Sequence, residues 1–168
     1  SSIVDLFDLK RDPEFINHLI TMRQLRALKK DSAVYDIGQN VQLEIKYCST
    51  VSVNKTFLRL IIKTVDGEPI TMLTNTTGFP VMQNKDERIR FCVDTSHLVP
   101  GRYTMSFVFY EVNEFGGSTN LDGLKDVYCF EITTVPGFNN NMEWQQRYWG
   151  NVYFAPLDIY EQGSEING

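Results

Sequence analysis

A two-residue alternation of apolar and polar side chains, repeated in several short segments, constrains the fold of this chain more than any other feature. In the first of them, Val41, Leu43 and Ile45 alternate with polar neighbours. Because successive side chains of a β-strand point to opposite faces, this period predicts a strand that is buried on one face. The same period recurs in residues 58–63, 89–93, 103–110 and 128–132.

Turn residues separate these segments, and no long helical pattern interrupts them. An Asp-Gly pair at residues 66–67 predicts a hairpin turn into a further strand at residues 70–74, and a Pro-Gly pair at residues 100–101 predicts another turn. Short alternating strands with turn signals between them are typical of an antiparallel β-sandwich. The sequence therefore predicts an all-β fold.

One segment, residues 15–28, allows two interpretations. Ile16, Ile20 and Met22 would share one face of a strand. The helical alternative places Leu19, Met22, Leu25 and Arg26 together. Both interpretations stay open, and neither changes the all-β prediction.

Length and composition indicate one globular domain. The 168 residues are 42% hydrophobic and 22% charged, which is ordinary for a folded domain, and no stretch reaches the roughly 18 apolar residues of a membrane span. A net charge of −5 argues against binding to the nucleic-acid backbone. We expect a linker or docking arm at residues 1–14, the sandwich at residues 15–136, and a C-terminal loop and strand at residues 137–168.

The cysteines and the start of the chain indicate its setting. Cys48, Cys92 and Cys129 are odd in number and widely spaced, which favours a reduced, cytosolic protein, although one bridge with a spare thiol is an alternative. The first residues show neither a signal peptide nor an initiator Met, so we expect a piece of a longer polypeptide.

Motifs for catalysis and for cofactors are absent from the sequence. There is no Walker A motif and no Gly-x-Ser-x-Gly, and His18 and His97 lack partners at metal-ligand spacing. Residues 120–123 with Asp126 resemble a calcium loop only weakly, and we expect a hairpin turn there. With 21 acidic residues, carboxylate pairs near strand ends are expected by chance, so such pairs are no sign of a glycosidase. Together with the absent motifs, this leads us to predict no enzyme, no metal and no cofactor. The acidic residues considered for such a pair are Asp94, Glu111, Glu114 and Glu131.

Binding chemistry remains, because the chain carries eleven Phe, eight Tyr and two Trp. Sugars stack their C–H faces on aromatic rings and pair their hydroxyl groups with polar side chains. Most of the rings occupy alternating core positions, but some polar and aromatic residues face outward on strands or lie outside the strands. These candidate ligand-binding residues are Arg59, Arg88, Arg90, Ser106, Tyr110, Trp144 and Trp149.

Five of the seven candidates have a simpler interpretation. The three arginines can be ordinary solvated charges, and the two tryptophans can form a lid over the edge of the sandwich. Residues 152–154 predict a short strand that either rejoins its own sheet or pairs with a neighbouring molecule. The residues of this candidate dimer strand are Asn151, Val152, Tyr153 and Phe154.

Four stretches in order indicate a family. They are Val-Tyr-Asp-Ile-Gly at residues 34–38, Asp-Gly-Glu-Pro-Ile at 66–70 followed by Asn75-Thr76, Leu-Val-Pro-Gly-Arg-Tyr at 98–103, and Asp-Val-Tyr-Cys-Phe-Glu-Ile at 126–132. In this order and spacing they resemble the C-terminal domain of the ATP-binding subunit of bacterial polysaccharide ABC exporters, the Wzt type that moves O-antigen. The resemblance covers about residues 16–135.

The resemblance implies an immunoglobulin-like sandwich attached to a cytoplasmic ATPase domain that this chain does not contain. In the family such a module recognises the exported polysaccharide, often by a modification at its non-reducing end, and tends to dimerise by exchanging a C-terminal strand, which would suit residues 151–154. The implied partners are a polysaccharide, a second copy and, through the ATPase domain, a membrane permease. The implied location is the inner face of the bacterial cell membrane.

Three functions are therefore compared: a carbohydrate-binding module, an immunoglobulin-like dimerisation or docking module without glycan affinity, and a small glycan-active enzyme. The first is the leading hypothesis. The family's ligand contacts carry no short motif that maps onto this sequence, so the candidate residues come from the predicted strand faces alone.

Overall fold

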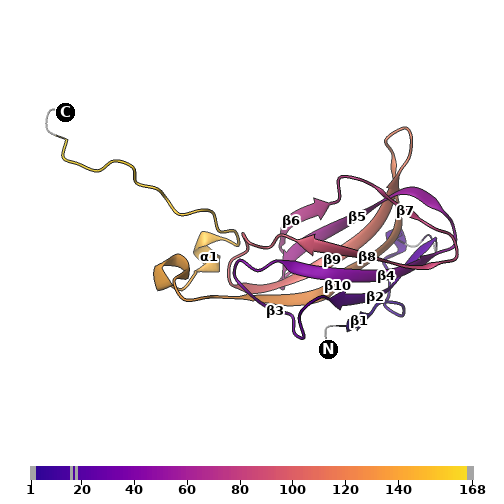
Figure 1. Cartoon of the computed structure of the whole chain (residues 1–168), viewed down its shortest axis with the longest axis horizontal. Helices are drawn as coiled ribbons and strands as arrows, with labels where there is room; N and C mark the ends of the chain where they lie inside the picture. The colour runs from indigo at the N-terminus through magenta and orange to yellow at the C-terminus, as the bar shows by residue number, and fades with distance from the viewer. Residues whose placement is uncertain (1–2, 16, 18, 166–168) are drawn as a thin grey trace.

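Two β-sheets face each other and enclose the apolar core (Figure 1). The computed structural model describes residues 3–15, 17 and 19–165, and within them one sheet has four strands and the other has six. The four-stranded sheet has the order β1 (Ile3–Asp5), β2 (Ile20–Ala27), β4 (Val41–Ser49) and β8 (Asp86–Val93). The six-stranded sheet has the order β3 (Val34–Asp36), β10 (Ser118–Thr133), β9 (Gly101–Val112), β5 (Val53–Thr64) and β6 (Pro69–Thr74), with β7 (Phe79–Val81) also paired to β5. The predicted all-β sandwich is confirmed, although β3 and β10 run parallel.

The alternating segments form the long strands, and their apolar positions fill the space between the sheets. Tyr47 of β4 meets Phe109 of β9 edge-on with ring centroids 5.2 Å apart, and Phe91 of β8 meets Phe107 of β9 at 6.0 Å. These contacts cross from one sheet to the other, so aromatic packing joins the two layers. The predicted hairpin turn joins β5 to β6 at Gly67, whose φ of 88° favours glycine.

The N-terminal segment lies against the four-stranded sheet. β1 pairs antiparallel with β2, Leu6 is fully buried in the core, and a 3₁₀ turn, η1 (Pro13–Phe15), follows. In its described part, the segment predicted as a linker or docking arm is thus docked onto the sandwich. Residues 20–27 form a strand rather than a helix, while Ile16 and His18 lie outside the described residues.

The turn predicted at residues 120–123 is wrong, because these residues belong to β10. The chain reverses earlier, where the backbone N–H of Asn113 donates to the carbonyl of Gly117 over 2.8 Å. Asp122 is buried and accepts hydrogen bonds from the backbone of Met22 and the side chain of Arg11, which holds it inside the sandwich. Within the described residues, no three His, Cys, Asp or Glu side chains form a group that could hold a metal ion.

The C-terminal segment lies at one end of the sandwich (Figure 1), with a 3₁₀ segment η2 (Phe138–Asn141) and one helical turn α1 (Gln146–Trp149). Val152 forms an isolated bridge with Leu98, and the N–H of Tyr153 donates to the carbonyl of His97 over 2.7 Å. The short strand predicted at residues 152–154 is therefore reduced to one bridge with the chain's own loop. Residues 155–165 are exposed and run away from the sandwich.

The cysteines are unbridged: Cys48 is half-buried, and Cys92 and Cys129 are exposed. In the described part of the chain, no helix has both the length and the apolar character needed to cross a membrane.

Candidate functional site

The predicted binding residues lie on three separate surfaces. Arg59, Ser106 and Tyr110 are on the outer face of the six-stranded sheet, whereas Arg88 and Arg90 are on the outer face of the four-stranded sheet. The two tryptophans are in the C-terminal segment at the end of the sandwich. Arg88 and Arg90 therefore lie on the opposite side of the core from Arg59. The sequence did not predict this separation, because the period-two pattern gives the face of a strand on which a residue lies but not the sheet to which the strand belongs.

The first surface, called the aromatic sheet face, comprises Phe57, Arg59, Thr74 and Tyr110. Phe57 and Tyr110 are register partners on β5 and β9, and their rings stack with centroids 5.4 Å apart and planes 22° apart. The guanidinium of Arg59 lies 5.4 Å from the centroid of the Tyr110 ring, and the Tyr110 and Thr74 hydroxyls hydrogen-bond over 3.0 Å. Sequence reasoning missed Phe57 and Thr74, although the alternation in β5 places Phe57 on the same face as Arg59.

Ser106 has a structural partner on the same sheet. Its hydroxyl accepts a hydrogen bond from the backbone N–H of Asp126 over 2.9 Å, and Thr104 donates to the Asp126 carboxylate over 3.0 Å. Asp126 has φ of 52° in a bulge of β10 that covers both hydroxyl residues, which is why Thr104 and Ser106 are buried instead of exposed as the alternation predicted. The exposed Asp126 carboxylate, rather than Ser106, is therefore the group of this cluster that faces solvent.

A cleft opens beside the aromatic sheet face, between β8 and strands β5 to β7. It has a volume of about 360 Å³ and a mostly apolar lining that includes Leu60, Leu73 and Phe91. Thr74 lines this cleft and also bonds Tyr110, so the cleft and the aromatic sheet face are continuous around the edge strand β6.

The second surface, called the cationic sheet face, consists of two rows of side chains across β2, β4 and β8. Register pairing places Arg26, Glu44 and Arg90 in one row and Gln24, Lys46 and Arg88 in the next. Arg88 and Arg90 were predicted, whereas Arg26 was missed because its segment did not distinguish strand from helix.

Glu44 is the centre of this face and is 1% exposed. Its Oε2 accepts hydrogen bonds from Arg90 Nε at 2.7 Å and Arg26 Nη2 at 3.3 Å, and Arg88 Nη1 lies 3.6 Å away. Burial alone would raise the pKa of Glu44, but the hydrogen bond from Arg90 and the charges of Arg26 and Arg90 outweigh it and hold this pKa below its usual range. Glu44 is thus a carboxylate that stays charged and fixes the guanidinium groups around it.

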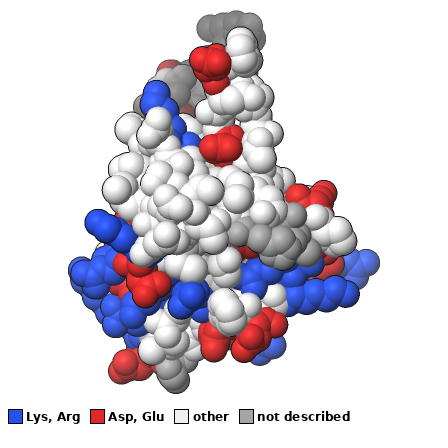
Figure 2. Space-filling model, turned by 90° about the vertical axis from the view of Figure 1, so that its right-hand side faces the viewer, with Lys and Arg blue, Asp and Glu red and all other residues white. Residues whose placement is uncertain are grey.

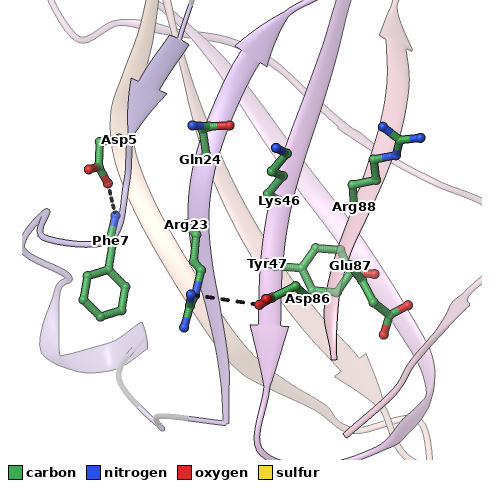
Figure 3. Close-up of a pocket in the computed structure, with 9 residues that line it drawn as sticks. All are labelled: Asp5, Phe7, Arg23, Gln24, Lys46, Tyr47, Asp86, Glu87 and Arg88. Carbon is green, nitrogen blue, oxygen red and sulfur yellow. Dashed lines mark hydrogen bonds and ion pairs between the residues drawn. The ribbon is translucent and has the colours of Figure 1, made fainter. Parts of the chain in front are cut away.

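Beside this face lies an open depression of about 700 Å³ (Figure 3). Gln24, Lys46 and Arg88 stand on three neighbouring strands along one side of it, and Phe7 lies on the other side. The acidic residues Asp5, Asp86 and Glu87 also line it. Figure 2 views the molecule from the right-hand side of Figure 1. In Figure 2, charged side chains gather in the lower part of the surface, and the middle of the surface is mostly uncharged.

The third surface is the aromatic cluster of the C-terminal segment. Trp144 contacts Phe138, Trp149 and Tyr153 with ring centroids 5.5–6.1 Å apart, and its indole N–H donates to the carbonyl of Gly150 over 2.8 Å. These contacts make Trp144 part of a small packed cap, in line with the lid interpretation. Trp149 is 44% exposed.

Residues 19–142, more than half of the chain, match the family model described as the Wzt C-terminal domain. Among solved structures, the crystal structure of the C-terminal domain of a Wzt protein is similar, with a TM-score of 0.66 and 15% identity, covering 94% of this chain and 100% of that one.

A second solved structure is more distant. It is the CARDB domain of a Pyrococcus furiosus protein in complex with di-metal ions, with a TM-score of 0.39 and 12% identity, covering 74% of this chain and 100% of that one. No curated protein sequence matches the chain. At 15% identity the likeness to the Wzt structure supports the fold, and the family model identifies the kind of domain.

Proposed function

Because the chain belongs to the Wzt C-terminal domain family, whose members are part of the ATP-binding subunits of O-antigen ABC exporters, we propose that it is a non-catalytic module that binds the exported polysaccharide. The domain context is a polysaccharide exporter, and the chain itself has no Walker A motif.

The aromatic sheet face carries this proposal. The stacked Phe57 and Tyr110 rings offer an apolar surface to the C–H face of a sugar, while the Arg59 guanidinium and the hydroxyls of Thr74 and Tyr110 surround that surface with polar groups. An aromatic platform with hydrogen-bonding groups at its rim suits a sugar ring. Most glycoside hydrolases place two carboxyl groups across a cleft, whereas the aromatic sheet face presents rings, hydroxyls and a guanidinium.

The neighbouring cleft suits a modified chain end. Its apolar lining can accept a small substituent such as a methyl or acetyl group, while the sugar that carries the substituent lies on Tyr110. Recognition of a modified non-reducing end would then use the two connected parts together.

The partners and the location follow from the same proposal. The first 14 residues would continue into the ATPase domain, which would contact the permease at the cytoplasmic face of the membrane. A homodimer would form through residues 151–154 and the exposed segment after them.

The test is a calorimetric titration of the isolated domain with the producing cell's own polysaccharide, carrying its native end group. We expect saturable binding without degradation of the glycan, and Tyr110→Ala should weaken binding at least tenfold because the stacking surface is lost. Tyr148→Ala removes an exposed tyrosine of α1, outside both the aromatic sheet face and the proposed dimer segment, and serves as the control.

Two outcomes would contradict different parts of the proposal. A native domain that fails to bind this polysaccharide would overturn glycan recognition. Equal binding by the wild type and by a folded Tyr110→Ala variant would move the site away from the aromatic sheet face.

One observation favours the alternative, an immunoglobulin-like dimerisation or docking module. Phe154, Leu157, Ile159 and Tyr160 are 78–95% exposed, so the C-terminal segment presents apolar side chains that a second copy could cover. In that case the domain is a dimer in sedimentation equilibrium, deletion of residues 137–168 gives monomers, and no polysaccharide binds. A monomeric full chain would exclude dimerisation, and saturable polysaccharide binding would exclude the alternative as a whole.

A further inference from the structure

The cationic sheet face concentrates positive charge on a chain whose net charge is negative. Its two rows hold four cations, Arg26, Lys46, Arg88 and Arg90, against one carboxylate, Glu44, whereas the whole chain has a net charge of −5. Residues in register on adjacent strands have Cβ atoms about 4.5–5.5 Å apart, and rows two residues apart along a strand are separated by roughly 7 Å. The four cations therefore lie within the span of one small ligand.

Glu44 orders the arginines without neutralising the face. One carboxylate balances one of the three guanidinium groups around it, and it is buried beneath them. The side chains of Arg88 and Arg90 are 58% and 50% exposed, so both remain open to a ligand from solvent. The arrangement is a preformed set of donors rather than a closed ion pair.

Lys46 adds a charge that no neighbour balances. Its ammonium group has no hydrogen-bond or ion-pair partner among the described residues, and its register partner is Arg88, a like charge. Like charges directly opposite each other on adjacent strands destabilise a sheet. An anion between them would remove this repulsion.

The acidic residues near the face are engaged elsewhere. Asp86 lies 3.9 Å from Arg23, Glu87 accepts the backbone N–H of Met82 over 2.7 Å, and Asp5 accepts the backbone N–H of Phe7 over 3.0 Å. Asp5 stands at the β1 end of the row, with Gln24 between it and Lys46, and Asp86 and Glu87 stand below the row in Figure 3.

From this geometry we infer that the cationic sheet face is a binding site for an oxyanion, a phosphate or a carboxylate group, on the opposite sheet from the aromatic sheet face. Guanidinium groups bind both kinds of anion through paired N–H donors, and Lys46 supplies a further point charge. The adjoining depression has room for the remainder of an anion-bearing molecule such as an acidic sugar. The inference does not depend on the proposed polysaccharide binding.

The experiment is an NMR titration of the domain at low ionic strength, with inorganic phosphate in one arm and glucuronate in the other, and with neutral N-acetylglucosamine as the reference sugar. We expect saturable shifts of the amides of β2, β4 and β8 with one or both anions, which weaken as salt is added. Binding of phosphate alone would indicate phosphorylated ligands, and binding of glucuronate alone would indicate acidic sugars.

Matched variants separate a site from a general charge effect. Lys46→Gln should weaken anion binding at least threefold, whereas Lys63→Gln, which removes the same charge from the outer face of β5 in the other sheet, should leave it unchanged. Lys46 is exposed, so the variant keeps the core intact. Absence of saturable shifts with both anions, equal weakening by both variants, or equal binding of N-acetylglucosamine at these strands would overturn the inference.

Discussion

Among the described residues, Glu44 and Asp122 are the buried carboxylates, and each accepts hydrogen bonds from arginine in a different setting. Glu44 accepts from arginines whose other sides are open to solvent, so its cluster belongs to the surface. Asp122 is paired with Arg11, and their side chains are 6% and 11% exposed, so that pair is largely shielded from solvent. Removing a partner from an enclosed pair leaves an uncompensated buried charge, which costs far more than loosening a surface pair.

The depressed pKa of Glu44 makes stability depend on pH in a direction that can be stated. The folded-state pKa lies below the ordinary value of 4.5, so the unfolded chain takes up the proton first as pH falls. The contribution of the Glu44 carboxylate to stability is therefore fully present above about pH 5.5, and it declines as pH falls through 4.5 and the folded-state pKa.

We predict that Glu44→Gln lowers the free energy of unfolding at pH 7 and that its difference from the wild type shrinks towards zero in acid. Urea unfolding of both proteins at several pH values between 3 and 8 measures this difference. Glu143→Gln, an exposed carboxylate after β10, is the control and should give no such dependence. A difference that stays constant from pH 7 to pH 3 would contradict the assignment.

At the scale of elements, Arg11 joins the N-terminal segment to both sheets. Its guanidinium donates to the carbonyls of Leu6 and Met22 at 2.7 and 2.9 Å, and to the Asp122 carboxylate at 3.1 Å. Asp122 in turn accepts the backbone N–H of Met22 in β2 at 2.7 Å. One ion pair thus connects the docked segment and β2 to β10 of the opposite sheet.

We predict that Asp122→Ala lowers the free energy of unfolding by about 3–5 kcal/mol, because the Arg11 guanidinium and the Met22 N–H both lose their carboxylate partner inside the protein. Chemical unfolding followed by tryptophan fluorescence measures the loss. Asp158→Ala, in the exposed C-terminal segment, is the matched control. A loss below about 1 kcal/mol would mean that Arg11 finds another partner or water.

The same pair marks the limit of prediction from the sequence. Period-two alternation predicted the strands because it reflects a local property, the burial of one face. The turn predicted at residues 120–123 was wrong because the partners of Asp122 lie about a hundred residues away, and no local pattern contains that information. The predicted site residues lie on two different sheets for a similar reason. Arg59 and Arg90 both alternate with apolar residues, and only the strand order of the folded protein shows that they belong to different sheets.

At the scale of the whole molecule, the C-terminal segment has two parts with different roles. Residues 138–153 cap the end of the sandwich: Gln146 donates to the hydroxyl of Tyr103, and the N–H of Val99 donates to the carbonyl of Asn151. This cap covers Leu98 and Val99, which are buried. Residues 155–165 are exposed and leave the sandwich, so they add little to the stability of a single copy.

Two truncations test this division. Deletion of residues 155–168 should leave the free energy of unfolding of the monomer unchanged, because its described part buries little surface. Deletion of residues 137–168 should lower it by about 1.5–3 kcal/mol, the free energy gained by burying one aliphatic side chain such as Leu98. Urea unfolding at a protein concentration low enough to keep the chain monomeric measures both values. If the shorter truncation destabilised the monomer as much as the longer one, the exposed segment would fold back onto its own sandwich, and it would no longer be free to pair with a second copy.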